Sequence, residues 1–140
     1  MAIFLNNKVG FKVATVNLSD HVTNFQLNRM VDSLEVTAMG DTAHKFVAGL
    51  AADTITVTFL NDTAAGSVLA TLQAAFGSTV AFQAIQDSST AVSATNLLYS
   101  GTIFVDNLTD INGATGDEAT IDITFTCNSK TAYASTGTWT

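Results

Sequence analysis

Residues 54–85 read TITVTFLNDTAAGSVLATLQAAFGSTVAFQAI, and this stretch contains two different hydrophobic periods. In its first seven residues, Ile55, Val57 and Phe59 alternate with threonine. Side chains on a β-strand point alternately to the two faces of a sheet, so this spacing predicts a strand with one buried face. Residues 79–85 continue the pattern with Val80 and Phe82 and predict a second strand.

The segment between these two strands has the period of a helix. Its apolar residues recur at intervals of three and four: Val68, Leu69, Leu72, Ala75 and Phe76. This spacing predicts a single amphipathic α-helix over about residues 63–76. Its first amides can be capped by Asn61, Asp62 or Thr63, and Gly77 supplies the left-handed residue on which helices commonly end.

Outward from this stretch, the alternation of period two dominates the chain. Further strands are predicted at 11–18, 22–29, 33–38, 99–108 and 119–127. Seven strands at this spacing predict a mainly β chain, a β-sandwich or small barrel of about seven or more strands with one flanking helix. Residues 40–53 and 87–97 lack a strong period and are predicted to be loops.

The length of 140 residues fits one domain with one core. We predict a single domain over 1–140, with residues 1–10 as an N-terminal segment and residues 128–140 as a C-terminal arm or tail. No apolar run is long enough to cross a membrane, and the start of the chain does not resemble a secretory signal. The single cysteine, Cys127, cannot form an internal disulfide, and its parity with Phe125 predicts an inert core thiol.

The charge balance is acidic, with five Lys and Arg against 12 Asp and Glu and a net charge of −7. The basic residues are scattered singly, whereas phosphate binding needs them clustered, so a nucleic-acid-binding module is not predicted. Charged residues make up only 12% of the chain, and proline is absent. Natural sheets guard exposed edges with proline and charge, so this composition predicts a protein that associates with other protein, edge to edge.

Residues 31–59, VDSLEVTAMGDTAHKFVAGLAADTITVTF, resemble the tail tube (major tail) proteins of long-tailed bacteriophages. The resemblance rests on a V-T-A-x-G-D-T unit at the end of a strand (residues 36–42), then Lys45 with Phe46, then the A-G-L unit of residues 48–50. A helix after the fourth strand, an S-A-T-N segment at 93–96 and a Gly-Asp turn at 116–117 follow in the order of that family. The similarity covers about residues 13–127.

The resemblance implies a β-sandwich or barrel with one flanking helix, a fold shared with the tube protein of type VI secretion. It further implies a structural virion protein whose hexameric rings stack into a hollow tube, assembled in the host cytoplasm, that conducts viral DNA during ejection. The implied partners are further copies of the chain and other tail proteins, such as the tape measure, tail terminator and distal tail proteins. Double-stranded DNA would pass without specific binding. No cofactor and no membrane contact are implied.

The predicted loop at 40–53 is long and partly apolar, which a free loop seldom is. Phe46, Val47 and Leu50 would gain nothing from water, so we expect them to enter an apolar pocket on a neighbouring copy. The predicted contact between subunits or rings consists of Asp41, Thr42, His44, Lys45, Phe46, Val47 and Leu50. The alternative is that Phe46 and Leu50 fold back onto their own domain.

A second group of candidates is acidic. The segment DNLTDINGATGDEATID contains the candidate lumen acids Asp106, Asp110, Asp117, Glu118 and Asp122. A wall lined with carboxylates would repel DNA phosphates and offer the DNA no sticking points. A calcium loop is the alternative, but an EF-hand aligned on Gly113 would need acids where Leu108 and Ala119 stand.

No enzyme activity and no metal site are predicted. Asp41, His44 and a serine could be arranged as a hydrolase triad, but no G-x-S-x-G motif occurs. The competing hypothesis for function is a monomeric β-sandwich module that binds carbohydrate or a host surface. Such a module needs exposed aromatic rings, and apart from nine phenylalanines the aromatic residues are Tyr99, Tyr133 and Trp139. Trp139 would lie in the C-terminal arm or tail, where it either anchors the arm on a neighbouring copy or stays loose.

Overall fold

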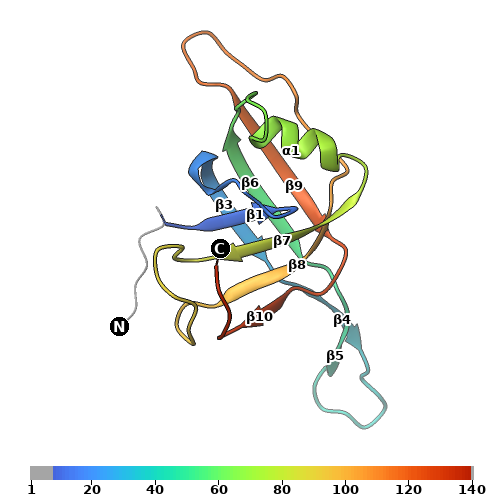
Figure 1. The fold of residues 1–140 in the computed structure, drawn as a ribbon. Helices are drawn as coiled ribbons and strands as arrows, with labels where there is room; N and C mark the ends of the chain where they lie inside the picture. The colour runs from blue at the N-terminus through green and yellow to red at the C-terminus, as the bar shows by residue number, and fades with distance from the viewer. Residues whose placement is uncertain (1–7, 140) are drawn as a thin grey trace.

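The computed structural model describes residues 8–139, which form a β-rich body with two long projections (Figure 1). The strands are β1 Gly10–Val13, β2 Val16–Asn17, β3 Val22–Asn28, β4 Val31–Glu35, β5 Phe46–Ala51, β6 Thr54–Leu60, β7 Thr79–Ile85, β8 Leu98–Phe104, β9 Thr120–Cys127 and β10 Ala132–Ala134. The helical elements are the 3-10 turn η1 Ser19–His21 and the helix α1 Val68–Ala75. In these described residues, no helix is long and apolar enough to span a bilayer.

Eight strands form one antiparallel sheet in the order β2-β1-β7-β8-β9-β6-β3, with β10 beside β8. Strands β8 and β9 share only the pairs Ile103 with Cys127 and Phe104 with Thr126, so the sheet turns a corner between them. Figure 1 shows the two halves crossing, with β3, β6 and β9 running along one diagonal and β1, β7 and β8 across it. The predicted fold class, mainly β with one helix, is confirmed.

The core lies between the two halves of the sheet. The ring of Phe11 on β1 reaches Phe25 on β3 and Phe59 on β6, with centroids 4.9 and 6.1 Å away. The fully buried side chains come from alternate strand positions and from α1 and include Val13, Ile55, Val57, Val68, Leu72, Ile103, Ile121 and Phe125. These are the inward positions that the alternation in the sequence predicts.

The helix is shorter than predicted. It begins at Val68 rather than near residue 63, because Gly66 has a φ of +77° and residues 62–67 form a turn. Gly77, with a φ of +79°, follows the helix as expected. The predicted strand at 11–18 is likewise two strands, because Ala14 and Thr15 adopt φ values of 50° and 71° in a tight turn between β1 and β2.

The prediction of a loop over 40–53 was wrong for half of that segment. Residues Phe46–Ala51 form β5, which pairs with β4 in a separate two-stranded sheet. The two strands and their connection, residues 30–52, form the hairpin that projects from the body in Figure 1, and we call it the β4–β5 hairpin. Its strands carry apolar residues on both faces, so their sequence lacks the alternation of apolar and polar residues that marks a half-buried strand.

The C-terminal segment packs on its own domain. Strand β10 pairs with the first half of β8, and Trp139 lies half-buried with its ring 4.4 Å from the Lys12 ammonium. A Cβ atom on Gly10 would approach Trp139 Cζ2 to 2.5 Å, so only glycine fits beneath the ring. Of the predicted N-terminal segment, residues 1–7 lie outside the described residues.

Candidate assembly surfaces

The β4–β5 hairpin concentrates exposed hydrophobic side chains. Among residues 8–139, eleven large hydrophobic side chains are exposed, and eight of them lie on the hairpin. Phe46 is 60% and Leu50 81% exposed, although the sequence left open that both fold back onto the domain. The others are Met30, Val31, Leu34, Val36, Met39 and Val47. An exposed apolar patch of this extent marks an interaction surface in a soluble protein.

Both faces of the hairpin are apolar. Leu34 and Val47 are directly opposite each other across the strands and share one face. Phe46 lies opposite Glu35, one position from that pair, and therefore points to the other face. A register shift between Val31 and Ser33 bends the ribbon near its base. Because neither face is covered by the body, an isolated two-stranded ribbon of this kind gains little stability in water.

The tip of the hairpin is held by polar contacts of its own. Lys45 Nζ lies 2.8 Å from Asp41 Oδ1, and Asp41 Oδ2 accepts a 2.8 Å hydrogen bond from the amide of Ala38. These partners, Lys45 first, hold the pKa of Asp41 below its ordinary value. Glu35 contacts the imidazole of His44, which lowers the pKa of Glu35 in the same way. His44 and Asp41 therefore serve separate contacts and do not pair as a catalytic dyad.

The hairpin is fastened to the body by Asp53, which is only 3% exposed. Its Oδ1 accepts a 2.9 Å hydrogen bond from the amide of Met30, and its Oδ2 accepts a 2.8 Å bond from the amide of Thr131. Burial alone would raise the pKa of Asp53, but these two amides outweigh burial and lower it. One carboxylate thus joins the base of the hairpin to the segment before β10. Sequence patterns gave no sign of this role.

All seven predicted interface residues lie on this hairpin. Asp41, Thr42, His44 and Lys45 are in the tip, and Phe46, Val47 and Leu50 are on β5. Sequence reasoning did not include the other exposed apolar residues of the hairpin in this contact, namely Met30, Val31, Leu34, Val36 and Met39. The strand predicted at 33–38 places Leu34 and Val36 on one side, and that pattern does not distinguish a strand of the body from one that projects.

The outward face of β3, β6 and β9 forms a second distinctive surface. Strand pairing aligns its side chains in three rows: Asn24 with Thr58 and Asp122, Gln26 with Thr56 and Thr124, and Asn28 with Thr54 and Thr126. Their neighbours Ile55, Val57 and Ile123 are buried on the opposite face. The face is therefore polar, and Asp122, which accepts a hydrogen bond from Thr58, is the one charged group in these rows.

The five candidate lumen acids are not together. Asp122 lies on this polar face, whereas Asp106, Asp110, Asp117 and Glu118 belong to the connection between β8 and β9, residues 105–119. Figure 1 shows that this connection, which we call the acidic loop, projects at the end of the molecule opposite the β4–β5 hairpin. Within residues 8–139, no group of three His, Cys, Asp or Glu side chains is placed to hold a metal ion.

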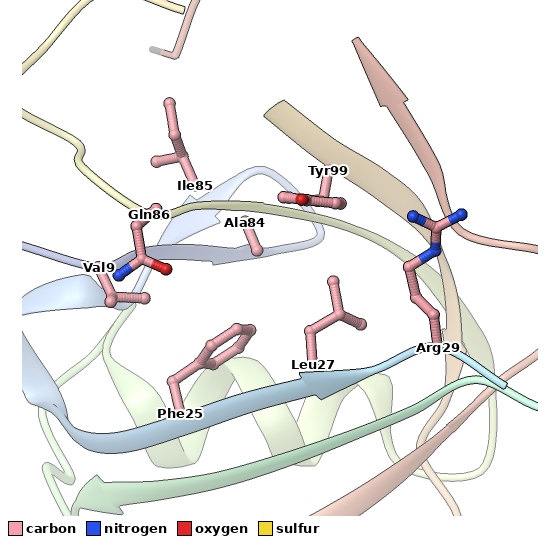
Figure 2. A pocket seen from close by; sticks show the side chains of 8 residues that line it. All are labelled: Val9, Phe25, Leu27, Arg29, Ala84, Ile85, Gln86 and Tyr99. Atoms are coloured by element: carbon pink, nitrogen blue, oxygen red, sulfur yellow. The ribbon is translucent and has the colours of Figure 1, made fainter. Parts of the chain in front are cut away.

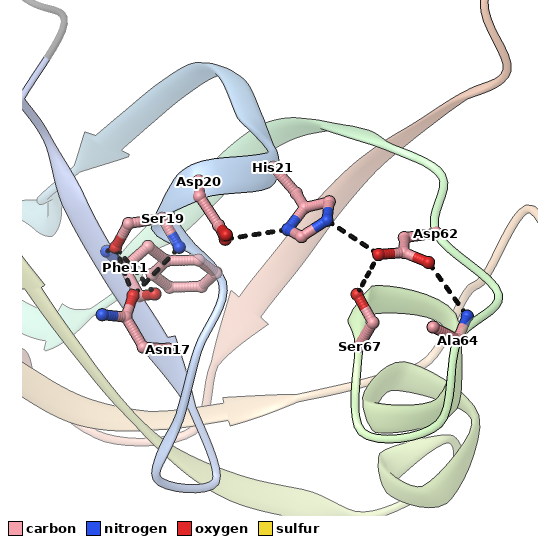
Figure 3. Close-up of polar contacts among 8 residues, drawn as sticks. All are labelled: Phe11, Asn17, Ser19, Asp20, His21, Asp62, Ala64 and Ser67. Atoms are coloured by element: carbon pink, nitrogen blue, oxygen red, sulfur yellow. Dashed lines mark hydrogen bonds and ion pairs between the residues drawn. The ribbon is translucent and has the colours of Figure 1, made fainter.

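A cluster of polar side chains links η1 to the start of α1 (Figure 3). His21 Nδ1 lies 2.8 Å from Asp20 Oδ1, and His21 Nε2 lies 2.9 Å from Asp62 Oδ2. Asp62 also accepts hydrogen bonds from Ser67 Oγ and the amide of Ala64. Burial lowers the pKa of His21, but the hydrogen bonds to Asp20 and Asp62 outweigh burial and raise it above 6.5.

We expect this cluster to make stability depend on pH. The imidazolium can donate from both nitrogens, whereas the neutral ring donates from only one. Because the pKa is raised on folding, the stabilisation is fully present below 6.5 and is lost as the pH rises through the raised value. Urea unfolding of wild type and His21→Gln should therefore differ more at about pH 5.5 than at about pH 8.5. A difference that is the same at both pH values would contradict the assignment.

A cleft of about 340 Å³ opens where β3 faces β7 (Figure 2), lined by Val9, Phe25, Leu27, Arg29, Ala84, Ile85, Gln86 and Tyr99. It is at the small end of the range for ligand pockets. Figure 2 shows two of its polar side chains, Gln86 and Arg29, at opposite sides of the cleft. Of the tyrosine and tryptophan side chains that could stack on a sugar, Tyr99 and Trp139 are half-buried, and Tyr133 is 57% exposed and contacts Tyr99 and the guanidinium of Arg29. One exposed ring of this kind gives little surface for stacking on carbohydrate.

Comparisons with known proteins give similarity in structure but not in sequence. No family model and no curated protein matches the sequence. The SPP1 tail tube structure superimposes with a TM-score of 0.74 at 11% identity, covering 94% of this chain and 78% of that one. A chain of the virion of the native gene transfer agent particle gives 0.70 at 11% identity, covering 94% of this chain and 99% of that one.

A third similar structure is the tail of the empty gene transfer agent particle, refined helically with C6 symmetry. It gives a TM-score of 0.62 at 13% identity, with 81% of this chain and 82% of that chain covered. At such low identity these matches establish the fold. They confirm the resemblance that residues 31–59 indicated: the chain has the fold of tail tube proteins.

Proposed function

We propose that this protein is a structural subunit of a virion, which assembles into hexameric rings that stack into a hollow tail tube. The observation that carries the proposal is the β4–β5 hairpin, which holds large apolar side chains on both faces away from a well-packed body. The tail tube fold supports the same role, and one of the similar tails has sixfold symmetry. The tube would conduct DNA and would contact other tail proteins at its ends.

The energetics of the hairpin favour assembly. Removing one Phe side chain from water is worth roughly 2 to 3 kcal/mol, and the hairpin carries eight large apolar side chains. Each contact is repeated in every subunit of a ring. Asp41 pairs with Lys45, and Glu35 contacts the imidazole of His44, so each of these side chains already has a polar partner at the tip when the hairpin docks.

The edges of the main sheet support association as well. Strand β3 is the last strand on one side of the sheet, and its sequence VTNFQLN contains neither proline nor lysine. An edge of seven residues without such guards can recruit a strand from another copy. Pairing along this edge would join the sheets of neighbouring subunits into one continuous wall.

We propose that the polar face of β3, β6 and β9 lines the channel of the tube. Its three rows contain no Lys or Arg, so DNA phosphates would find no cation to bind. Asp122 adds the negative charge that repels phosphate. Of the five acids considered for the lumen, we keep Asp122 in that role. The other four lie in the acidic loop, at one end of the molecule.

The test images the concentrated protein by electron microscopy and then probes the channel with DNA. We expect wild-type tubes to form and to retain no DNA when assembled with short duplex fragments. Tubes of the Gln26→Lys/Asp122→Lys variant should retain DNA that a nuclease cannot digest, because the lysines face the channel. The control Thr63→Lys/Ala65→Lys places both charges at exposed positions before α1, outside the polar face, and should give no protected DNA.

Three outcomes would contradict this proposal. Featureless monomers would favour the binding-module hypothesis. DNA held by Gln26→Lys/Asp122→Lys tubes but fully digested would place the polar face on the outside of the tube. Protected DNA in the control tubes would show that retention does not report the channel wall.

A further inference from the structure

The basic side chains of this chain are distributed unevenly along the molecule. Residues 46–129 contain no Lys, Arg or His. The acidic loop and α1, which both belong to this stretch, lie at one end in Figure 1. Three of the five Lys and Arg residues lie at the hairpin end: Lys45 in the tip, and Arg29 and Lys130 beside the hairpin base. The same end also carries Asp32, Glu35, Asp41 and Asp53, so its positive charge is local, at Arg29 and Lys130.

The base of the hairpin contains a groove with two cations, Arg29 and Lys130. Its volume is about 340 Å³, and its lining is Arg29, Met30, Val31, Ala51, Asp53 and Lys130. Met30 and Val31 are 52% and 47% exposed and give it an apolar floor. The Asp53 carboxylate, held by the amides of Met30 and Thr131, keeps its charge and offsets one of the two cations, Arg29 and Lys130, so the groove has a net charge of 2 − 1 = +1. A matching occupant would present an apolar side chain flanked by carboxylates.

The acidic loop presents such a group. Ile111 is 93% exposed and follows Asp110 directly. Asp106, Asp117 and Glu118 complete the loop's acids, and in the described part of the chain the ion pairs involve other carboxylates. Asp110 receives one long hydrogen bond, 3.4 Å from Gln73 Nε2 on α1. Among residues 8–139, these loop carboxylates thus form no ion pair within a single copy.

We infer that the acidic loop of one copy docks into the basic groove of a second copy, with Ile111 on Met30 and Val31 and the loop acids beside Arg29 and Lys130. The contact deepens the proposed function, on which it rests, by naming the surfaces that join successive rings. It is heterologous, since two different patches meet. Such a contact propagates as an open filament when it does not close into a ring.

A charge exchange tests the contact. Arg29→Glu/Lys130→Glu and Asp110→Lys/Glu118→Lys each place like charges across it, and each should reduce tube yield at least about tenfold in sedimentation and electron microscopy. The chain that carries all four substitutions restores opposite charges, and its tubes should return. Lys8→Glu, which removes a cation outside the groove, should leave the yield unchanged.

The experiment distinguishes failure of this contact from failure of the proposed tube function. Wild-type tubes together with normal assembly of either reversed variant, or with no recovery in the fourfold variant, overturn the contact and leave the tube role standing. An absence of tubes from wild type overturns the tube role and the contact together. Circular dichroism checks folding. If Arg29→Glu disturbs folding, the exchange is repeated with Lys130→Glu and Asp110→Lys. Each substitution alone should reduce the tube yield, and the two together should restore it.

Discussion

Replacing Phe46 and Leu50 together by alanine should abolish tubes while shifting the melting temperature of the monomer by no more than about 2 °C. Both side chains are mostly exposed in a single copy, so the monomer loses little when they are removed. In the assembly, each lost Phe or Leu contact is worth roughly 2 to 3 kcal/mol, repeated around every ring. Thermal unfolding and electron microscopy of the same samples measure the two effects.

Phe76→Ala is the matched control. Phe76 is 55% exposed, close to the 60% of Phe46, but lies at the end of α1 rather than on the hairpin. This control should form normal tubes. If the double variant also forms normal tubes, the hairpin does not join the subunits. A clear fall in its melting temperature would instead show that Phe46 and Leu50 stabilise their own domain.

Phe11→Ala should have the largest effect on folding, a loss of about 3 to 5 kcal/mol in the free energy of unfolding. Phe11 is fully buried, and its ring lies 4.9, 6.1 and 6.5 Å from the rings of Phe25, Phe59 and Phe82. The side chain therefore joins both halves of the sheet, and alanine would leave a cavity between them. A domain is stable by only about 5 to 15 kcal/mol, so much of its stability would be lost.

Urea unfolding of purified monomer measures this loss. Phe11→Leu keeps most of the volume and should lose less than the alanine variant, which separates the cavity from the change of residue. A loss below about 1 kcal/mol for Phe11→Ala would mean that the two halves of the sheet do not depend on this ring.

The sequence predicted best those elements that bury one face in the body of the same chain. Strands β6 and β7 were predicted with their observed bounds, because Ile55, Val57 and Phe59 alternate with polar residues. β5 was missed because Phe46 on one face and Val47 on the other are both apolar, and no period marks such a strand. β10 has three residues, too few to show a period.

The candidate surfaces were predicted less completely, because they depend on how the strands pair and not on the period within one strand. The apolar character of Phe46, Val47 and Leu50 in an apparent loop was visible in the sequence, and it led to the hairpin. Which acids share a surface depends on how strands pair. Asp122 and Glu118 are close in sequence, yet strand β9 begins between them and carries Asp122 onto the polar face. The groove that contains Arg29 and Lys130 joins residues far apart in sequence.

The position of Trp139 has a practical consequence for following this protein in solution. It is the single tryptophan of the chain, and its ring is held over Gly10 with the Lys12 ammonium 4.4 Å away. The indole emission of the whole molecule therefore originates at one place, where the C-terminal segment covers β1. Its wavelength and yield give a label-free optical signal of whether that segment is seated, in the dispersed chain and in any polymer it forms.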